Sequence, residues 1–249
     1  GDFNGDEVAD ILWRHKTSGA NSIWLMDENG KRSSKSNPGK LGMAWDVAGV
    51  DDLNGDGVSD ILWRHKTSGA NSIWLMDENG KRSSKSNPGK LGIAWDVAGV
   101  DDLNGDGISD ILWRHKTSGA NSIWLMDENG KRSSKSNPGK SGIVWDVAGV
   151  DDLNGDGVSD ILWRHKTSGA NRIWFMDEEG KRDSQVNPGK LDIAWDVAEV
   201  SDFNADGVAD ILWRHKTSGA NRIWFMDNDG ILDSSVNPGN LSSSWDVGI

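Results

Sequence analysis

The sequence repeats itself at intervals of fifty residues, and this repetition restricts the architectures that the chain can adopt. Asp52–Gly57 recurs unchanged at Asp102–Gly107 and Asp152–Gly157, and with small changes at Asp2–Glu7 and Asp202–Gly207. Repeats of this length are typical of solenoids, propellers and related arrays. The pattern inside one repeat must therefore distinguish between these architectures.

Four short segments of each repeat have the composition of β-strands. In the second repeat, residues 60–65 and 71–76 are rich in β-branched and aromatic side chains, and a glycine-containing turn separates them. An Asn-Gly pair at 79–80 signals a hairpin and leads into the polar residues 81–86, an expected edge strand. Residues 95–100 supply the fourth strand. Because no segment has a convincing helical pattern, each repeat is predicted to form a four-stranded antiparallel blade.

The strand at 71–76 favours a propeller over other repeat folds. Ile73 and Leu75 point to one face and Trp74 and Met76 to the other, so both faces are apolar and buried. Blades stacked around an axis are buried in this way, whereas a parallel β-helix usually needs a shorter repeat. We predict an all-β, five-bladed β-propeller that forms a single domain over residues 1–249, with repeats at about 1–50, 51–100, 101–150, 151–200 and 201–249.

The two ends of the sequence predict how the propeller closes. Residue 1 follows the position of a fourth strand, and Trp245–Ile249 is a copy of that strand. We expect this C-terminal strand to pair with residues 10–15 and to close the ring within one chain, giving a monomer. A ring assembled from several chains is the alternative, because near-identical blades permit it. Such similarity also follows from recent duplication or design, so it carries no functional weight.

Composition excludes several classes of partner and site. The 27 Lys and Arg residues against 39 Asp and Glu residues give a net charge of −12, which argues against binding nucleic acid or an anionic membrane through general electrostatics. No apolar run approaches the roughly eighteen residues that a membrane helix needs, so we expect no membrane insertion. The absence of cysteine excludes disulfides and thiolate metal sites. Fifteen tryptophans, three in each repeat, are the predicted core.

Each repeat also contains an acidic loop in which oxygen-bearing side chains alternate. The pattern is Asp-x-Asn-x-Asp, with a glycine at position six and a further Asp at position nine. Calcium takes six to eight oxygen ligands at about 2.3–2.6 Å, and three carboxylates in one loop repel one another without a cation. An EF-hand is excluded because its twelfth residue, a glutamate, is Trp63 here. A metal-free Asn-Gly-Asp-Gly turn is the competing interpretation. We predict about one Ca²⁺ per repeat.

The pattern at residues 52–64 and its copies resembles the FG-GAP or VCBS-type repeat family, which occurs in bacterial surface and secreted proteins and in the integrin α-subunit propeller. The resemblance implies an extracellular or cell-surface propeller whose calcium loop links the innermost strand of a blade to the next, with the metal serving architecture. By position, the implied ligands are Asp2, Asn4, Asp6, Val8 and Asp10; Asp52, Asn54, Asp56, Val58 and Asp60; Asp102, Asn104, Asp106, Ile108 and Asp110; Asp152, Asn154, Asp156, Val158 and Asp160; and Asp202, Asn204, Asp206, Val208 and Asp210.

Two loops depart from the repeated pattern. Glu7 replaces the glycine at position six, and we expect it to strain the first loop and to disfavour its metal site. Ala205 replaces the glycine at position four, where we expect a smaller effect.

Five equivalent repeats argue against an enzyme, because a catalytic centre usually needs an asymmetric set of acid, base and nucleophile. We predict a non-catalytic binding, adhesion or scaffold module whose partner is a protein or a glycan. The alternative is a multivalent lectin with sugar sites between blades, where Arg64 and His65 line a pocket with tryptophan. The competing interpretation of His65 is a packed, hydrogen-bonded imidazole at the end of a blade. An inert scaffold without a ligand beyond the ion is the third hypothesis.

Overall fold

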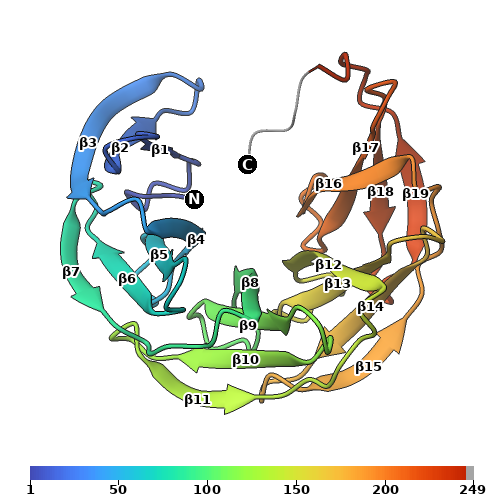
Figure 1. Cartoon of the computed structure of the whole chain (residues 1–249). Helices are drawn as coiled ribbons and strands as arrows, with labels where there is room; N and C mark the ends of the chain where they lie inside the picture. The colour runs from blue at the N-terminus through green and yellow to red at the C-terminus, as the bar shows by residue number, and fades with distance from the viewer. Residues whose placement is uncertain (245–249) are drawn as a thin grey trace. The chain divides into compact units, whose positions relative to one another are not determined.

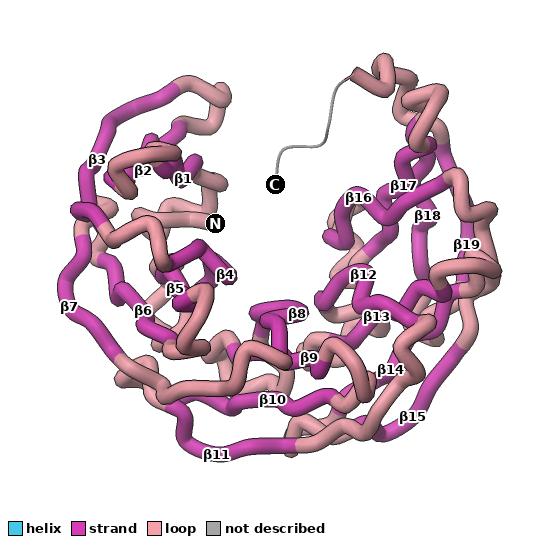
Figure 2. Tube along the Cα trace, viewed as in Figure 1, coloured by secondary structure: helices cyan, strands magenta, loops and turns pink. Residues whose placement is uncertain are grey.

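The computed structural model describes residues 1–244, and every regular element in this part of the chain is a β-strand (Figures 1 and 2). No helix that could span a membrane occurs among these residues. The chain divides into two compact units. The first comprises Gly1–Val100, Gly107–Lys116 and Ile123–Lys135, and the second comprises Asp101–Asp106, Thr117–Ser122 and Ser136–Ile249. The single domain expected over residues 1–249 stays a prediction.

The strands form five sheets, and the strand order within each sheet follows the chain. The first sheet contains β1 (Ile11–Arg14), β2 (Ala20–Met26) and β3 (Arg32–Lys40), and the second contains β4 (Trp45–Asp51), β5 (Asp60–His65), β6 (Asn71–Met76) and β7 (Arg82–Ser86). The third contains β8 (Trp95–Asp101), β9 (Asp110–His115), β10 (Asn121–Met126) and β11 (Arg132–Ser136). The fourth contains β12 (Trp145–Asp151), β13 (Asp160–His165), β14 (Asn171–Met176) and β15 (Arg182–Val186), and the fifth contains β16 (Trp195–Ser201), β17 (Asp210–His215), β18 (Asn221–Met226) and β19 (Leu232–Val236).

Neighbouring strands run antiparallel, as in the second sheet, where Val50 is opposite Ile61 and Ile61 is opposite Trp74. Sheets of three or four antiparallel strands, one for each repeat, make the fold an all-β five-bladed propeller, as the sequence predicts. The predicted strands at 60–65 and 71–76 coincide with β5 and β6.

The sheets are offset from the sequence repeats, which corrects the expected content of a blade. Residues 95–101 form β8, the first strand of the third sheet, and do not join the second sheet. The reason lies in the acidic loop, which returns the chain antiparallel so that Asp51 at the end of β4 is opposite Asp60 at the start of β5. The acidic loops of the second to fifth repeats therefore each connect the first two strands of one sheet.

Within each unit, the core lies between consecutive sheets and is rich in tryptophan. In the second sheet all six residues of β6 are buried, which confirms a strand covered on both faces. Trp63 and Trp74 are fully buried, with ring centres 5.0 Å apart. Leu53 and Ile73 pack against Trp113 of the third sheet, so apolar contacts continue from one sheet to the next.

The first sheet differs from the others at its free edge. Within residues 1–244 no strand pairs with β1 on the side away from β2. Ile11 and Trp13 are 37% and 47% exposed, whereas Ile61 and Trp63 at the matching positions are fully buried. The predicted partner of β1, Trp245–Ile249, lies outside the described residues, so closure by that strand stays a prediction.

Candidate functional site

The acidic loop of the second repeat is folded around the side chain of Asp52. Its Oδ1 accepts hydrogen bonds from the N–H groups of Gly55 at 2.7 Å and Asp56 at 3.2 Å, and its Oδ2 accepts one from Gly57 at 2.7 Å. Asp152 makes the same contacts in the fourth repeat. A short loop with consecutive inward N–H groups requires a carboxylate at this position, so the first Asp of the motif is a structural residue of the turn.

The acidic loops of the first four repeats are each hydrogen-bonded to the following repeat. The carbonyl of Asp2 accepts a hydrogen bond from the Ser59 N–H at 2.6 Å, and the carbonyl of Asp52 accepts one from the Ser109 N–H at 2.9 Å. The loops are therefore joints between consecutive repeats, and their rigidity affects the spacing between sheets.

Two oxygens in the second loop are buried without completed hydrogen bonds. Asn54 Oδ1 has no partner, and Asp60 Oδ2 lies beside the Leu53 N–H but completes no hydrogen bond. Burial raises the pKa of the Asp60 carboxyl to about 8, with the charges of Asp56 and Asp52 acting in the same direction. Buried oxygens with spare acceptor capacity beside negative charges are suited to a cation.

The fourth loop has the same electrostatics with one difference in hydrogen bonding. Burial raises the pKa of the Asp160 carboxyl to about 8, with the Asp156 and Asp152 charges acting in the same direction. Asp160 Oδ2 accepts a hydrogen bond from the Leu153 N–H at 3.1 Å. The oxygen-only donor set of these loops suits a hard cation such as Ca²⁺.

Some predicted ligands already form hydrogen bonds within the loop. The Asn54 side-chain amide donates to Asp56 Oδ2 at 2.9 Å, and both oxygens of Asp52 accept backbone N–H groups. Within residues 1–244, no group of three or more His, Cys, Asp or Glu side chains converges to hold a metal ion. Asn and backbone oxygens would have to complete any site, so the metal ligands of all five loops stay predictions.

Two loops place a residue other than glycine in the left-handed region. Glu7 has φ of +66°, as expected for a residue that replaces the position-six glycine. Ala205 has φ of +61°, close to the +74° of Gly55 at the same loop position. The smaller effect expected at Ala205 is therefore a poor prediction, because both positions require positive φ and carry a comparable backbone cost.

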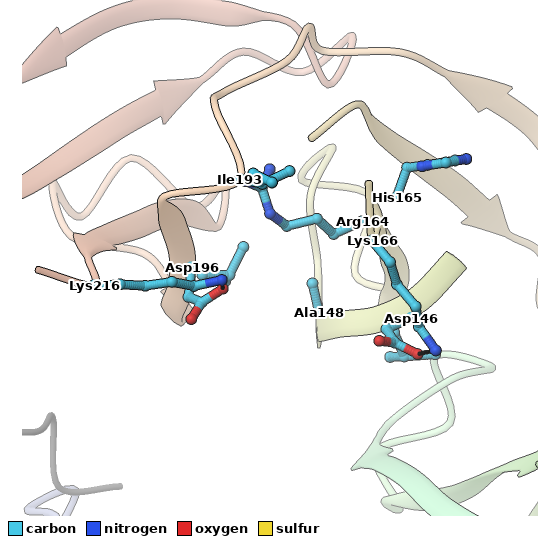
Figure 3. A pocket seen from close by; sticks show the side chains of 10 residues that line it. Asp146, Ala148, Arg164, His165, Lys166, Ile193, Asp196 and Lys216 are labelled. Atoms are coloured by element: carbon cyan, nitrogen blue, oxygen red, sulfur yellow. Dashed lines mark ion pairs between the residues drawn. The ribbon is translucent and has the colours of Figure 1, made fainter. Parts of the chain in front are cut away.

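A groove recurs where the first strands of two consecutive sheets lie next to each other. Between the second and third sheets it has a volume of about 410 Å³, and between the fourth and fifth about 360 Å³ (Figure 3). Matching positions line both grooves: Asp46, Val47, Ala48, Arg64, His65, Lys66, Ile93, Asp96, Val97 and Lys116 in the first, and Asp146, Val147, Ala148, Arg164, His165, Lys166, Ile193, Asp196, Val197 and Lys216 in the second. A third cavity, of about 440 Å³, adjoins Arg214 and His215 with Ser243 at the position of Ile193.

Ion pairs stand at both sides of each groove. Lys66 Nζ lies 3.0 Å from Asp46 Oδ1, and Lys116 Nζ lies 2.9 Å from Asp96 Oδ1. Figure 3 shows the matching Lys166–Asp146 and Lys216–Asp196 pairs. All of these side chains are about half exposed, so the pairs contribute little to stability and leave donors and acceptors available to a ligand.

Arg64 holds the groove together through hydrogen bonds from both of its terminal guanidinium nitrogens. Its Nη1 donates to Gly69 O and Asn71 Oδ1, and its Nη2 donates to Leu91 O, Gly92 O and Trp95 O at 2.7–3.3 Å. The loop that these carbonyls belong to carries Ile93 into the groove. Arg64 is thus a positioning residue. It lines a pocket, as predicted, but its Nη1 and Nη2 donors already bond to acceptors of the protein.

His65 has features of both roles considered from the sequence, a packed imidazole and a residue that lines a pocket. Its ring packs edge-on against Trp45 at 5.0 Å, and its Nδ1 accepts the Ser68 N–H at 3.2 Å. This contact favours the tautomer with its proton on Nε2, which makes no hydrogen bond within residues 1–244. His65 is therefore a packed imidazole that also presents one donor at the groove.

The apolar surface of the groove comes from residues that the sequence did not single out. Ile93 and Ile193 are 55% and 47% exposed, although isoleucine is usually buried. The tryptophans expected beside Arg64 and His65 do not line the groove, since Trp63 is fully buried and Trp45 packs against His65. An isoleucine followed by a predicted strand gave no signal of exposure, because apolar residues before strands are common in buried connections.

The repeat pattern itself identifies the family of the chain. The FG-GAP-like repeat pattern matches residues 2–63, 102–163 and 152–213, which together cover more than half of the sequence. The chain belongs to the FG-GAP-like repeat family. This confirms the resemblance drawn from residues 52–64 and its copies. A comparison with curated protein sequences gives no match.

Solved structures similar to this FG-GAP-like repeat protein share its fold at low sequence identity. A lectin from Agrocybe aegerita, which recognises non-reducing terminal N-acetylglucosamine, aligns with a TM-score of 0.71 and 16% identity over 96% of this chain and 65% of its own. A putative 6-phosphogluconolactonase from Bacteroides uniformis aligns with a TM-score of 0.55 and 13% identity over 94% of this chain and 69% of its own.

A third structure, an auxiliary nutrient binding protein from Bacteroides thetaiotaomicron, aligns with a TM-score of 0.51 and 8% identity over 92% of this chain and 58% of its own. The chain thus spans less than two thirds of both the lectin and the nutrient binding protein. At these identities the likenesses establish the fold alone.

Proposed function

We propose that this FG-GAP-like repeat protein is a non-catalytic binding module whose repeated grooves each take a carbohydrate. The observation that supports this most strongly is the recurrence of one lining, with ion pairs, an imidazole donor and an exposed isoleucine, in two grooves that are 100 residues apart in the sequence. A surface repeated in this way suits a ligand with several equivalent end groups, because multivalent contact raises avidity without any new contact.

The chemistry of the groove suits a sugar. A hydroxyl both donates and accepts, so neighbouring hydroxyls can bridge Asp46 and Lys66 as well as bond to the Nε2–H of His65. The C–H face or an acetyl methyl group of a sugar can pack against Ile93, which is otherwise exposed to water. The same fold in a lectin that recognises terminal N-acetylglucosamine adds support for this class of ligand.

A catalytic role has less support. The groove lacks an asymmetric acid, base and nucleophile set, and its arginine is bound to backbone carbonyls. The likeness to a putative 6-phosphogluconolactonase concerns the fold alone, at 13% identity.

The acidic loops complete the proposal as structural Ca²⁺ sites in an extracellular protein. Asn54 Oδ1 and Asp60 Oδ2 would be among the ligands in the second repeat, since both are buried with acceptor capacity to spare. A bound cation would neutralise the loop charge and stiffen the joint that links Asp52 to Ser109. We expect the unfolding temperature to fall when a chelator removes Ca²⁺. Equal unfolding temperatures with and without Ca²⁺ would remove this part of the proposal.

A glycan array tests the ligand class. The probes are oligosaccharides with different terminal sugars, N-acetylglucosamine among them, and the proteins are the wild type and the double variant Ile93→Ser/Ile193→Ser. Serine already occupies the matching position 243, so the variant is expected to fold. We expect wild-type binding to a defined set of terminal sugars and at least about a tenfold weaker signal for the variant, because each groove loses its apolar contact. Silence of the wild type across the array would contradict the proposal.

A further inference from the structure

The last strands of the first three sheets carry positive charge without acidic partners. Residues 31–40, 81–90 and 131–140 each contain four Lys or Arg residues and no Asp or Glu. None of these twelve cations forms an ion pair within residues 1–244, whereas Lys66, Lys116, Lys166 and Lys216 at the grooves are all paired. The matching segments 181–190 and 231–240 carry net charges of 3 − 1 = +2 and 0 − 1 = −1. The chain thus has a net charge of −12 but carries a local concentration of cations in these three segments.

Two of these cations are held at one aromatic ring. The Arg82 guanidinium lies 4.4 Å from the centre of the Trp74 ring, and Lys85 Nζ lies 5.6 Å from the same centre. Arg132 and Lys135 repeat the arrangement at Trp124, at 4.5 and 5.6 Å. Cation–π contact holds each guanidinium in place but leaves its in-plane N–H donors free for another group.

The fourth sheet contains a side-chain acceptor where the second and third sheets have a lysine. There Arg182 Nη1 donates to Gln185 Oε1 at 3.4 Å, so a side-chain acceptor occupies the position of Lys85. Lysine has no acceptor, and Arg82 makes no hydrogen bond within the described residues. The charges of Arg82 and Lys85 therefore repel each other, and their N–H donors are available to an external anion that would relieve this repulsion.

The preceding sheet approaches this arginine. A Cβ placed on Gly39 would lie 3.9 Å from Arg82 Nη1, so the turn before Lys40 adjoins the arginine. Gly89 stands at the same distance from Arg132 Nη1, and Lys90 follows it. Within the first unit, a lysine-containing turn of one sheet thus lies next to the arginine of the following sheet.

We propose that this surface of the first unit, the cationic edge formed by residues 31–40, 81–90 and 131–135, binds a linear sulfated polysaccharide. Each guanidinium can take two oxygens of one sulfate, and the adjacent lysines add point charges. A polyanion with regularly spaced sulfates can reach successive sheets at once and gains from their multiplicity. Exposed Ser34, Ser84 and Ser134 supply hydroxyls for the sugar between the sulfates.

Two other polyanionic partners fit this surface less well. An anionic membrane would be expected to meet exposed apolar side chains beside the charges, but the three segments expose no large hydrophobic residue. A single-stranded nucleic acid would be expected to stack its bases on aromatic rings, but Trp74 and Trp124 are fully buried. The proposal is independent of the grooves, since none of the cations at this edge lines them.

Titration calorimetry with heparin as the probe tests the proposal in buffers of rising salt concentration. The variant Lys35→Gln/Lys85→Gln/Lys135→Gln introduces the residue present at Gln185, so it is compatible with this sheet edge. We expect its Kd for heparin to rise by about tenfold or more at about 0.15 M salt, with a shallower salt dependence than the wild type. Matched thermal unfolding will verify that the variant is folded.

The control variant Lys16→Gln/Lys181→Gln/Lys190→Gln removes the same charge from exposed positions outside both this edge and the grooves. We expect it to bind heparin within about twofold of the wild type, because the total charge is not the determinant. An absence of wild-type binding would overturn the proposal, as would equal losses in the two triple variants. Tighter wild-type binding to single-stranded DNA or to anionic phospholipid vesicles than to heparin would overturn it as well. An absence of heparin binding would not affect the proposal for the grooves, which the glycan array tests separately.

Discussion

The guanidinium of Arg64 lies 4.7 Å from the centre of the Trp113 ring, so an arginine of one sheet stacks on an indole of the next. The same guanidinium donates to Trp95 O at 2.7 Å, at the start of the next sheet's first strand. Arg164 and Trp213 repeat the stack at 4.7 Å in the second unit. One side chain therefore joins two sheets and fixes the loop that carries the groove's isoleucine.

We predict that Arg164→Met lowers the free energy of unfolding by about 2–4 kcal/mol, because it leaves partly buried carbonyls without donors. Arg164 is nearly fully buried and bonds to Leu191 O, Asp192 O and Trp195 O. Chemical denaturation measures the change. Arg222→Ser is the control, since Ser72 occupies the matching position, and it should cost less than about 1 kcal/mol. Similar losses for the two variants would contradict the assigned role of Arg164.

The backbone of the first loop gives a second prediction. Glu7→Gly should raise the free energy of unfolding by about 1 kcal/mol, because φ of +66° is unfavourable for a residue with a Cβ. Ala205→Gly should act in the same direction, from φ of +61°. Ala209→Gly is the matched control and should destabilise, since Ala209 is buried and does not have positive φ. A loss of stability in Glu7→Gly would show that the loop carries no such cost.

The buried aspartates predict how stability depends on pH in the ion-free protein. Burial raises the pKa of Asp60 and of Asp160 from 3.8 to about 8, so the folded chain binds protons more tightly than the unfolded chain between these values. Stability should therefore fall as the pH rises from about 4 to about 8 when a chelator is present.

Added Ca²⁺ should reduce this pH dependence, because a cation favours the charged carboxylates. Denaturant unfolding at several pH values measures it, with the double variant Asp60→Asn/Asp160→Asn as the control. The variant should lose most of the slope attributable to these two groups. An equally steep fall in the variant would mean that other groups carry the effect.

Much of the fold followed from local sequence patterns. The fifty-residue repeat, the glycine turns and the two apolar faces of residues 71–76 predicted the strands and the propeller, and β6 is buried as expected. The assignment of residues 95–100 to the same blade was wrong, because strand pairing is a non-local property and the sequence repeat does not mark where a sheet begins.

The candidate site was less accessible to sequence reasoning. Arg64 and His65 were recognised, but their burial and bonding partners depend on a loop 27 residues away that supplies Leu91 O. Ile93 carried no signal, because only the packing of two sheets leaves it exposed. The sequence shows that Gln185 stands at the position of Lys85. Only the hydrogen bond from Arg182 to Gln185 shows that this difference decides whether the neighbouring arginine has a side-chain acceptor.

The repeated groove is the centre of the account, and counting its occupied copies tests it most directly. Titration calorimetry of the Ca²⁺-loaded chain should use an oligosaccharide with the terminal sugar that binds best on the array. We predict more than one equivalent site per chain, and a loss of heat in the variant Ile93→Ser/Ile193→Ser. A single site per chain, or unchanged binding by that variant, would contradict the claim that the grooves between consecutive sheets are the binding sites.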